Sequence, residues 1–239
     1  MKTEMIAALT SLARQRQAEL DSGIVSWREE TGDGVRLWCG PGCGNCCTLT
    51  VNCTLAEALA VRSILDDRLR ERLTATVEKI ICHARQCSDA RTFFSGYRRA
   101  VGPCPLLDDS ANCSIYAVRP LACRALLSTR PADWCGVNLA ELPEFERDAF
   151  LASLDRNMVA FPTHYAAAPQ ELAADLERGL MLAMIRTVGF GVTGNLPVLV
   201  WLTGQKGFDT LMNGSPASFL KFVAEQHVDH PFLMQIDVP

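Results

Sequence analysis

The sequence predicts a mainly α fold, a helical protein with a loop-rich cysteine-cluster metal-binding module. Apolar residues recur at helical spacing through most of the 239-residue chain. Eleven cysteines occur, all before residue 140 and most of them among glycines and prolines. Hydrophobic residues make up 49% of the chain and charged residues 21%, which is ordinary for a soluble globular protein with its own core.

Three segments follow from the distribution of these features. Residues 1–36 form an N-terminal helical segment. Residues 37–136 form the cysteine module, which carries a helical insert over residues 54–100. Residues 137–239 contain no cysteine and form a helical C-terminal part. We expect the three to make one compact unit, because no repeat or low-complexity linker separates them.

The N-terminal segment reads as one helix followed by a loop. Apolar residues at intervals of three and four predict an amphipathic helix from Thr3 to Leu20, and Gly23 is expected to end it. Glycines and a proline through residues 31–47 then predict the loop that carries the first cysteines.

The insert begins with a sequence signature for a helix start. Thr54 with Glu57 three residues later forms a capping box, in which each side chain satisfies the other residue's backbone amide. A second helical pattern over residues 73–81 leads into Cys82 and Cys87. Prolines exclude long helices from residues 102–136, which are expected to be loop.

Three helices are predicted in the C-terminal part. Helical patterns cover residues 141–158, 169–188 and 216–227, the last with Ser215 as its N-cap. The apolar run 196–202 fits a short strand or a buried helix, and periodicity alone does not decide between them.

Charge and hydropathy bear on partners and location. A net charge of −4 and a pI near 5.6 argue against a nucleic-acid partner. The richest apolar stretch, residues 180–202, is interrupted by an arginine, glycines, an asparagine and a proline, so we expect no membrane span. No targeting segment is apparent, and we expect a cytoplasmic protein.

The cysteine count favours metal over disulfides. The number is odd, the chain is long enough to build a core without cross-links, and no export signal is apparent. Thiols kept reduced in a cytosol are free to act as thiolate ligands.

The first cysteine cluster is a C-x3-C-x2-C-C run. Thiolates are soft ligands that select zinc, copper(I) or iron–sulfur clusters, and the interspersed glycines let backbone amides approach the sulfurs. Its members are Cys39, Cys43, Cys46 and Cys47. Adjacent Cys46 and Cys47 serve one centre only if the backbone is turned or helical. Otherwise one of them belongs to a second site or is packed as a small apolar residue.

The second half of the module adds four more candidate ligands. These are Cys104, Cys113, Cys123 and Cys135. Eight cysteines allow one centre with some left structural, or two centres. Arg119 and Arg124 lie near Cys123 in sequence, where a guanidinium would offset thiolate charge and donate hydrogen bonds to sulfur; ordinary surface arginines are the alternative.

The remaining cysteines carry a weaker signal. Cys53 lies just before a helix cap, and Cys82 and Cys87 lie in a helical segment, so we expect packed or free thiols. His83 beside Cys82 is expected to be a surface histidine more often than a nitrogen ligand.

Taken together, these motifs resemble the YkgJ-type, or CxxCxxCC-domain, family, whose members are described as zinc- or iron-chelating. The resemblance covers about residues 37–136, and its order of motifs is specific. It rests on the Cys39–Cys47 run with Leu49-Thr50, on Glu57, and on Cys104-Pro-Leu, Cys113-Ser-Ile-Tyr, Arg119-Pro120 and Cys123-Arg124. Three residues, instead of two, separate the first two cysteines. The resemblance implies a metal or iron–sulfur centre bound by these cysteines and no settled activity, although some members of the wider group resemble protein-lysine methylases.

Three functions remain open at this point. The favoured one is a redox or binding module that holds an iron–sulfur cluster, 4Fe–4S in type, or zinc, and that has a metal or a protein as partner. Eight cysteines with an adjacent pair exceed what one zinc needs. The second is a macromolecule-modifying enzyme, such as a protein methylase, with the cluster as cofactor or scaffold. The third is metal storage or delivery.

The spacing of the first three cysteines bears on the enzyme hypothesis. Cys39, Cys43 and Cys46 match the C-x3-C-x2-C triad of radical enzymes. Those enzymes place the triad in a long α/β barrel, whereas helical patterns follow here, so we rank this chemistry low. No catalytic residue is assigned, and whether the protein is an enzyme stays open.

Overall fold

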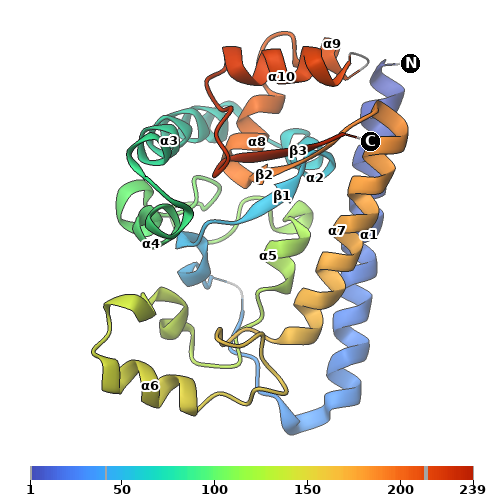
Figure 1. The fold of residues 1–239 in the computed structure, drawn as a ribbon. Helices are drawn as coiled ribbons and strands as arrows, with labels where there is room; N and C mark the ends of the chain where they lie inside the picture. The colour runs from blue at the N-terminus through green and yellow to red at the C-terminus, as the bar shows by residue number, and fades with distance from the viewer. Residues whose placement is uncertain (1, 41, 213–214, 239) are drawn as a thin grey trace.

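The structure, a computed structural model, describes residues 2–40, 42–212 and 215–238 and confirms the mainly α prediction (Figure 1). Over these residues, helices surround one small sheet of three strands. The α-helices are α1 (Lys2–Thr31), α2 (Leu55–Arg62), α3 (Asp67–Gln86), α4 (Ala90–Val101), α5 (Leu121–Ala125), α6 (Glu144–Ala152), α7 (Ala167–Val188), α8 (Leu196–Thr203), α9 (Phe208–Leu211) and α10 (Pro216–Glu225). The strands are β1 (Asn52–Thr54), β2 (Gly191–Asn195) and β3 (Met234–Asp237).

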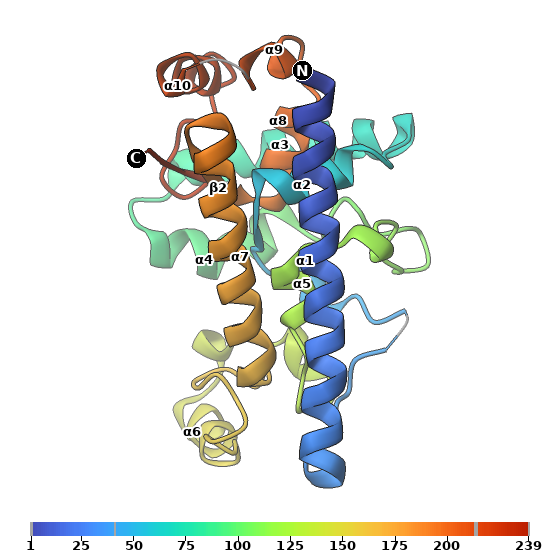
Figure 2. The same cartoon turned by 90° about the vertical axis from the view of Figure 1, so that its right-hand side faces the viewer.

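The longest helices, α1 and α7, lie side by side along one flank of the molecule (Figures 1 and 2). The expectation that Gly23 ends the first helix is wrong, because α1 continues to Thr31. A Cβ atom at Gly23 would collide with the Leu172 side chain of α7. The glycine therefore allows close approach of two helices, and this packing outweighs its low helix propensity.

The capping box at the start of α2 is confirmed. Thr54 N donates to Glu57 Oε2 over 2.8 Å, and Glu57 N donates to Thr54 Oγ1 over 3.3 Å. The other carboxylate oxygen of Glu57 accepts from Leu121 N over 2.7 Å. One buried side chain therefore both caps α2 and holds the start of α5 against it.

The three-stranded antiparallel sheet was not predicted from the sequence. Its order is β1-β2-β3, with Cys53 opposite Gly194 and Val192 opposite Ile236. The sheet joins the residues just after the first cysteine run to the C-terminal part of the chain. Each strand has three to five residues, too few to give a readable alternation of polar and apolar side chains.

The apolar run 196–202 is a buried helix, which settles the open choice. Strand β2 leads directly into α8, whose N-cap is Asn195, with Val198 N donating to Asn195 Oδ1 over 3.4 Å. Pro197 occupies the first turn, where its missing N–H costs nothing.

The other predicted helices are present with adjusted ends. The pattern over 73–81 lies inside α3, and α7 begins two residues before its predicted start. Helix α6 is shorter than the predicted 141–158, because Pro143 precedes its first turn and the chain leaves the helix after Ala152. Ser215 caps α10 as expected, accepting from Ser218 N over 3.2 Å.

The main hydrophobic core draws on helices from both ends of the chain. Leu20 of α1, Leu59 of α2, Ile80 of α3, Leu121 of α5 and Leu199 of α8 are all 2% exposed or less and belong to one cluster. A small second cluster, around Phe150 of α6, includes the partly buried Trp134. Within the described part of the chain, no helix combines the length and the apolar character that crossing a membrane requires.

Candidate metal centre

Two loops carry the eight predicted ligands, and they lie against each other. We call residues 38–50 the first loop and residues 102–136 the second loop. Cys104 N donates to Cys47 O over 2.8 Å, and Asn45 Nδ2 donates to Ala132 O over 2.9 Å. Cysteines more than fifty residues apart in sequence are thereby brought to one place below the sheet (Figure 1).

The adjacent pair Cys46 and Cys47 lies in a turned backbone. Residues Asn45–Thr48 form one turn of 3-10 helix, with Cys47 N donating to Gly44 O over 3.0 Å. A hydrogen bond with the Cys47 side chain, together with burial, raises the pKa of the Cys46 thiol. The two thiols therefore face each other, which is the arrangement that lets neighbouring cysteines serve one centre.

Cys46 lies at the middle of the cysteine set. Burial is the main cause that raises the pKa of five other thiols, and the charge of a Cys46 thiolate raises each pKa further. They are Cys39, Cys104, Cys113, Cys123 and Cys135. The pKa of Cys104 reaches about 12. These thiols are protonated at neutral pH, so a metal that binds them must displace their protons.

The cysteines divide into two groups that share Cys46 as a neighbour. The first, the Cys46 group, comprises Cys46, Cys47, Cys104, Cys113 and Cys123. Four of its members line one pocket, and the charge of the fifth, Cys113, acts on both Cys104 and Cys123.

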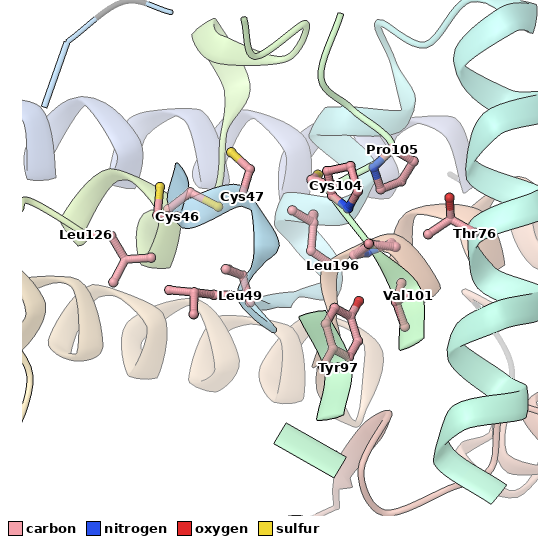
Figure 3. Close-up of a pocket in the computed structure, with 15 residues that line it drawn as sticks. Cys46, Cys47, Leu49, Thr76, Tyr97, Val101, Cys104, Pro105, Leu126 and Leu196 are labelled. Atoms are coloured by element: carbon pink, nitrogen blue, oxygen red, sulfur yellow. The ribbon is translucent and has the colours of Figure 1, made fainter. Parts of the chain in front are cut away.

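The pocket beside the Cys46 group is small and mainly apolar. Its volume is about 50 Å³, and Figure 3 shows Cys46, Cys47 and Cys104 above Leu49 and Tyr97 in that view. Small-molecule sites usually measure about 300–1,000 Å³. The pocket therefore shields sulfur from water and has no room for an organic substrate.

The second set, the Cys135 group, comprises Cys39, Cys43 and Cys135. The charges of Cys135 and Cys43 both act on Cys39. Cys39 Sγ accepts a hydrogen bond from Ser128 N over 3.2 Å. Cys39 is exposed, Cys43 is half-buried and Cys135 is buried, so this group runs from the surface inward.

His164 contacts the Cys135 group and was missed by sequence reasoning. Its Nε2 lies 3.3 Å from Cys135 Sγ, and the residue is 6% exposed. The tripeptide Thr163-His164-Tyr165 follows no metal-binding spacing, so only its burial next to a cysteine reveals it.

The two predicted arginines have different surroundings. Arg119 packs its guanidinium over the Tyr116 ring at 4.2 Å, and its charge lowers the pKa of Cys46, Cys113 and Cys123 against the larger effects that raise it. Arg124 is buried and donates to Arg119 O and Ala117 O, and pairs with Asp21 of α1 at 2.5 Å. Arg119 thus supplies positive charge to three thiols of the Cys46 group, whereas Arg124 holds α5 against α1 and acts on the pKa of Cys113 alone among these thiols.

The remaining three cysteines belong to neither group, although burial and then the charges of Glu57 and Cys123 raise the pKa of Cys53. Cys53 is buried in the core on β1, and Cys82 is exposed on α3. Cys87 Sγ lies 3.7 Å from the His83 ring nitrogens. His83 is half-buried, where the sequence suggested a surface position, because its ring stacks on Phe93 of α4.

The donor set fits a thiophilic centre. In the described parts of the chain, no three His, Cys, Asp or Glu side chains stand as close as ligands of one ion. All eleven cysteines are free thiols, and eight of them, Cys46 included, lie on two adjoining loops. Neutral thiols attract one another only weakly. We therefore expect the sulfurs to move closer together when a metal ion replaces their protons.

Soft sulfur donors on two loops, held by a helical body, define a cysteine-cluster metal-binding protein. Residues 38–140 match the model of the CxxCxxCC family, described as "Putative zinc- or iron-chelating domain". The match contains all eight predicted cysteines and both arginines, whereas His164 lies outside it. No curated protein and no solved structure matches the chain. The family supports metal binding by this protein.

Proposed function

We propose that this protein holds an iron–sulfur cluster, of 4Fe–4S type, through thiolates of the Cys46 group, and that it acts as a redox or binding module. Four of the five thiols in this group would supply the ligands that such a cluster needs. The cluster would supply one-electron chemistry or a rigid cross-link between the loops. A protein partner and a location in the reducing cytoplasm, which keeps the thiols free, are parts of this proposal.

The observation that carries the proposal is the central place of Cys46. Its charge acts on thiols of both loops, and Cys47 is its direct neighbour. An iron–sulfur cluster with four thiolates carries net negative charge, and Arg119 brings positive charge to the same group. The Cys46 backbone amide lowers the pKa of the Cys46 thiol against the larger effects that raise it, and hydrogen bonds from amides to sulfur tune the potential of a cluster.

The other two functions find less support. An enzyme that modifies a macromolecule needs a groove beside its cofactor, and the pocket next to Cys104 measures only about 50 Å³. Storage or delivery needs exchangeable, exposed thiols, whereas among the eight predicted ligands only Cys39 is exposed. A fixed centre fits this burial better.

Anaerobic purification followed by an absorption spectrum and by iron, sulfide and zinc analysis tests the proposal. We expect a brown protein with about four iron and four acid-labile sulfide per chain, as one 4Fe–4S cluster requires. A colourless protein with zinc alone would replace the cluster with a structural zinc centre. A protein free of both metals would refute the proposal.

Two single substitutions compare a proposed ligand with a matched thiol. Cys123→Ser removes a half-buried member of the Cys46 group and should abolish the iron and sulfide content. Cys82→Ser changes an exposed cysteine on α3, and the metal content should stay at the wild-type level. Equal metal content in both variants would remove Cys123 from the ligand set.

A further inference from the structure

The segment that carries His164 packs against the Cys135 group through backbone hydrogen bonds. Ser128 and Thr129 of the second loop lie between the first loop and residues 164–166. Trp38 N donates to Ser128 O over 3.0 Å on one side, and Thr129 N donates to His164 O over 3.0 Å on the other. Ser128 also pairs with Tyr165 as an isolated antiparallel bridge. Three separate parts of the chain are thereby held at one place.

The side chains at this place are of metal-binding types, and a bound ion would have to draw them closer together. His164 Nε2 lies 3.3 Å from Cys135 Sγ, and Cys39 Sγ lies 3.2 Å from Ser128 N. Cys39 Sγ also donates to Leu126 O over 3.6 Å, and Cys43 N donates to Gly40 O over 3.2 Å, which keeps Cys43 close to Cys39 along the backbone.

The His164 ring is held in place by its surroundings. Phe150 of α6 packs edge-on at 5.9 Å between ring centroids, and Tyr165 lies at 4.4 Å. The His164 carbonyl accepts from both Thr129 N and Thr129 Oγ1, the latter over 2.8 Å. Its Nε2 is therefore directed at sulfur by fixed packing, as in sites where a histidine acts as ligand.

We propose that His164 is a nitrogen ligand of a Zn²⁺ site completed by Cys39, Cys43 and Cys135. Three thiolates and one imidazole form one of the common structural zinc donor sets. Binding forms three Zn–S bonds and one Zn–N bond, and the three thiol protons pass to solvent. This inference rests on the proposed function, because it divides the eight cysteines between a zinc site and the Cys46 group.

The division gives a ligand role to seven of the eight predicted cysteines and leaves one thiol of the Cys46 group over. A 4Fe–4S cluster takes four thiolates, and five are present in the Cys46 group without the Cys135 group. His164 brings the three thiols of the Cys135 group to the four ligands that zinc requires. Without His164 this group would be one ligand short.

Zinc analysis and Co²⁺ titration of the full-length protein test the assignment. His164→Ala should weaken Zn²⁺ binding by more than about 100-fold, since losing only a residue that supports a ligand costs 10- to 100-fold. His164→Cys restores a fourth soft ligand and should recover Zn²⁺, with stronger sulfur-to-Co²⁺ charge-transfer absorption than the wild type. That rescue separates a ligand from a packing residue.

His83 provides the matched control, since it also lies beside a cysteine, 3.7 Å from Cys87 Sγ. His83→Gln should leave Zn²⁺ affinity and the Co²⁺ spectrum unchanged. In the wild type, histidine ¹⁵N resonances report directly on the ring nitrogens, and adding Zn²⁺ should shift those of His164 and leave those of His83 in place. This measurement uses the wild type alone, so it remains valid even if a substituted variant fails to fold.

The outcomes separate this inference from the proposed function. Loss of zinc in His164→Ala with unchanged iron and sulfide supports both. The zinc site is overturned if His164→Ala keeps the zinc affinity and the Co²⁺ spectrum of the wild type. It is also overturned if the wild type holds iron and sulfide but takes up no Zn²⁺. Both results leave the cluster proposal standing. A wild type that binds zinc at this site but holds no iron or sulfide overturns the cluster alone.

Discussion

The two loops that carry the predicted ligands are held in place by different means. The second loop inserts Leu106, Ile115 and Leu121 into the main core, and each is 1% exposed or less. Over residues 38–40 and 42–50, the described part of the first loop, no side chain is buried. Each fully buried large apolar side chain contributes about 1.5–3 kcal/mol. Apolar burial therefore fixes the second loop and leaves the first without such an anchor.

The first loop is tied down mainly by hydrogen bonds to the second. Trp38 N, Asn45 Nδ2 and Cys47 O each make one such bond. A hydrogen bond of this kind adds about 0.5–1.5 kcal/mol. The comparison teaches that apolar packing fixes the second loop before metal binds, and that bound metal would have to order the first loop.

Removal of metal should therefore affect the first loop most. If metal is present at about 1,000 times its Kd, it stabilises the ordered state by about 4 kcal/mol, which is roughly a 1,000-fold factor in amide exchange. We expect amides of residues 42–50 to exchange about that much faster after chelation, while α2 and α8 keep their protection. Hydrogen exchange with mass spectrometry on the loaded and chelated protein measures both. Equal loss of protection in α8 would mean that metal holds the whole fold together.

A matched pair of leucines tests the other side of the comparison. Leu106→Ala in the second loop removes a fully buried side chain and should lower the free energy of unfolding by about 2–5 kcal/mol. Leu49→Ala in the first loop removes a half-buried one and should cost about 1 kcal/mol or less. Urea unfolding of both variants under the same metal loading gives the two values. Similar costs would show that the first loop is also anchored by apolar packing.

The same contrast explains what the sequence could predict. The capping box at Thr54 and the N-cap at Ser215 depend on residues three positions apart, so local reasoning finds them. The eight cysteines stand out because their spacing and number are unusual. Such features can be recognised from the sequence without knowledge of the tertiary structure.

Features that depend on distant residues were missed. Gly23 reads as a helix end because glycine is a poor helix former, and only the contact with Leu172 on α7 shows what a glycine makes room for inside α1. Strand β1 pairs with β2, which lies some 140 residues further along the chain, and neither carries a clear pattern. His164 comes to Cys135 through pairing of residues 128 and 165, which no local motif encodes.

The smallest effect should come from Glu177, which joins α7 to the second loop. Burial, reinforced by the charge of Glu57, raises the pKa of Glu177 to about 8 from its ordinary value of 4.5, although a hydrogen bond from Ala122 N opposes the shift. The carboxyl group is therefore protonated in the folded protein at neutral pH and ionised in the unfolded chain. Stability from this group is fully present below about pH 4.5 and falls as pH rises toward about 8.

Glu177→Gln keeps a carbonyl oxygen for Ala122 N and removes the ionisation. We expect the variant to be more stable than the wild type by about 1–2 kcal/mol near pH 8 and equal to it near pH 4.5, after allowance for partial solvent screening. Urea unfolding at both pH values measures the difference, with Glu171→Gln on the exposed face of the same helix as control. A wild type and variant with the same pH dependence would show that water reaches Glu177. Water between Glu177 and Ala122 would mean that α7 packs less tightly against the second loop, and that this contact contributes little to fixing the loop in place.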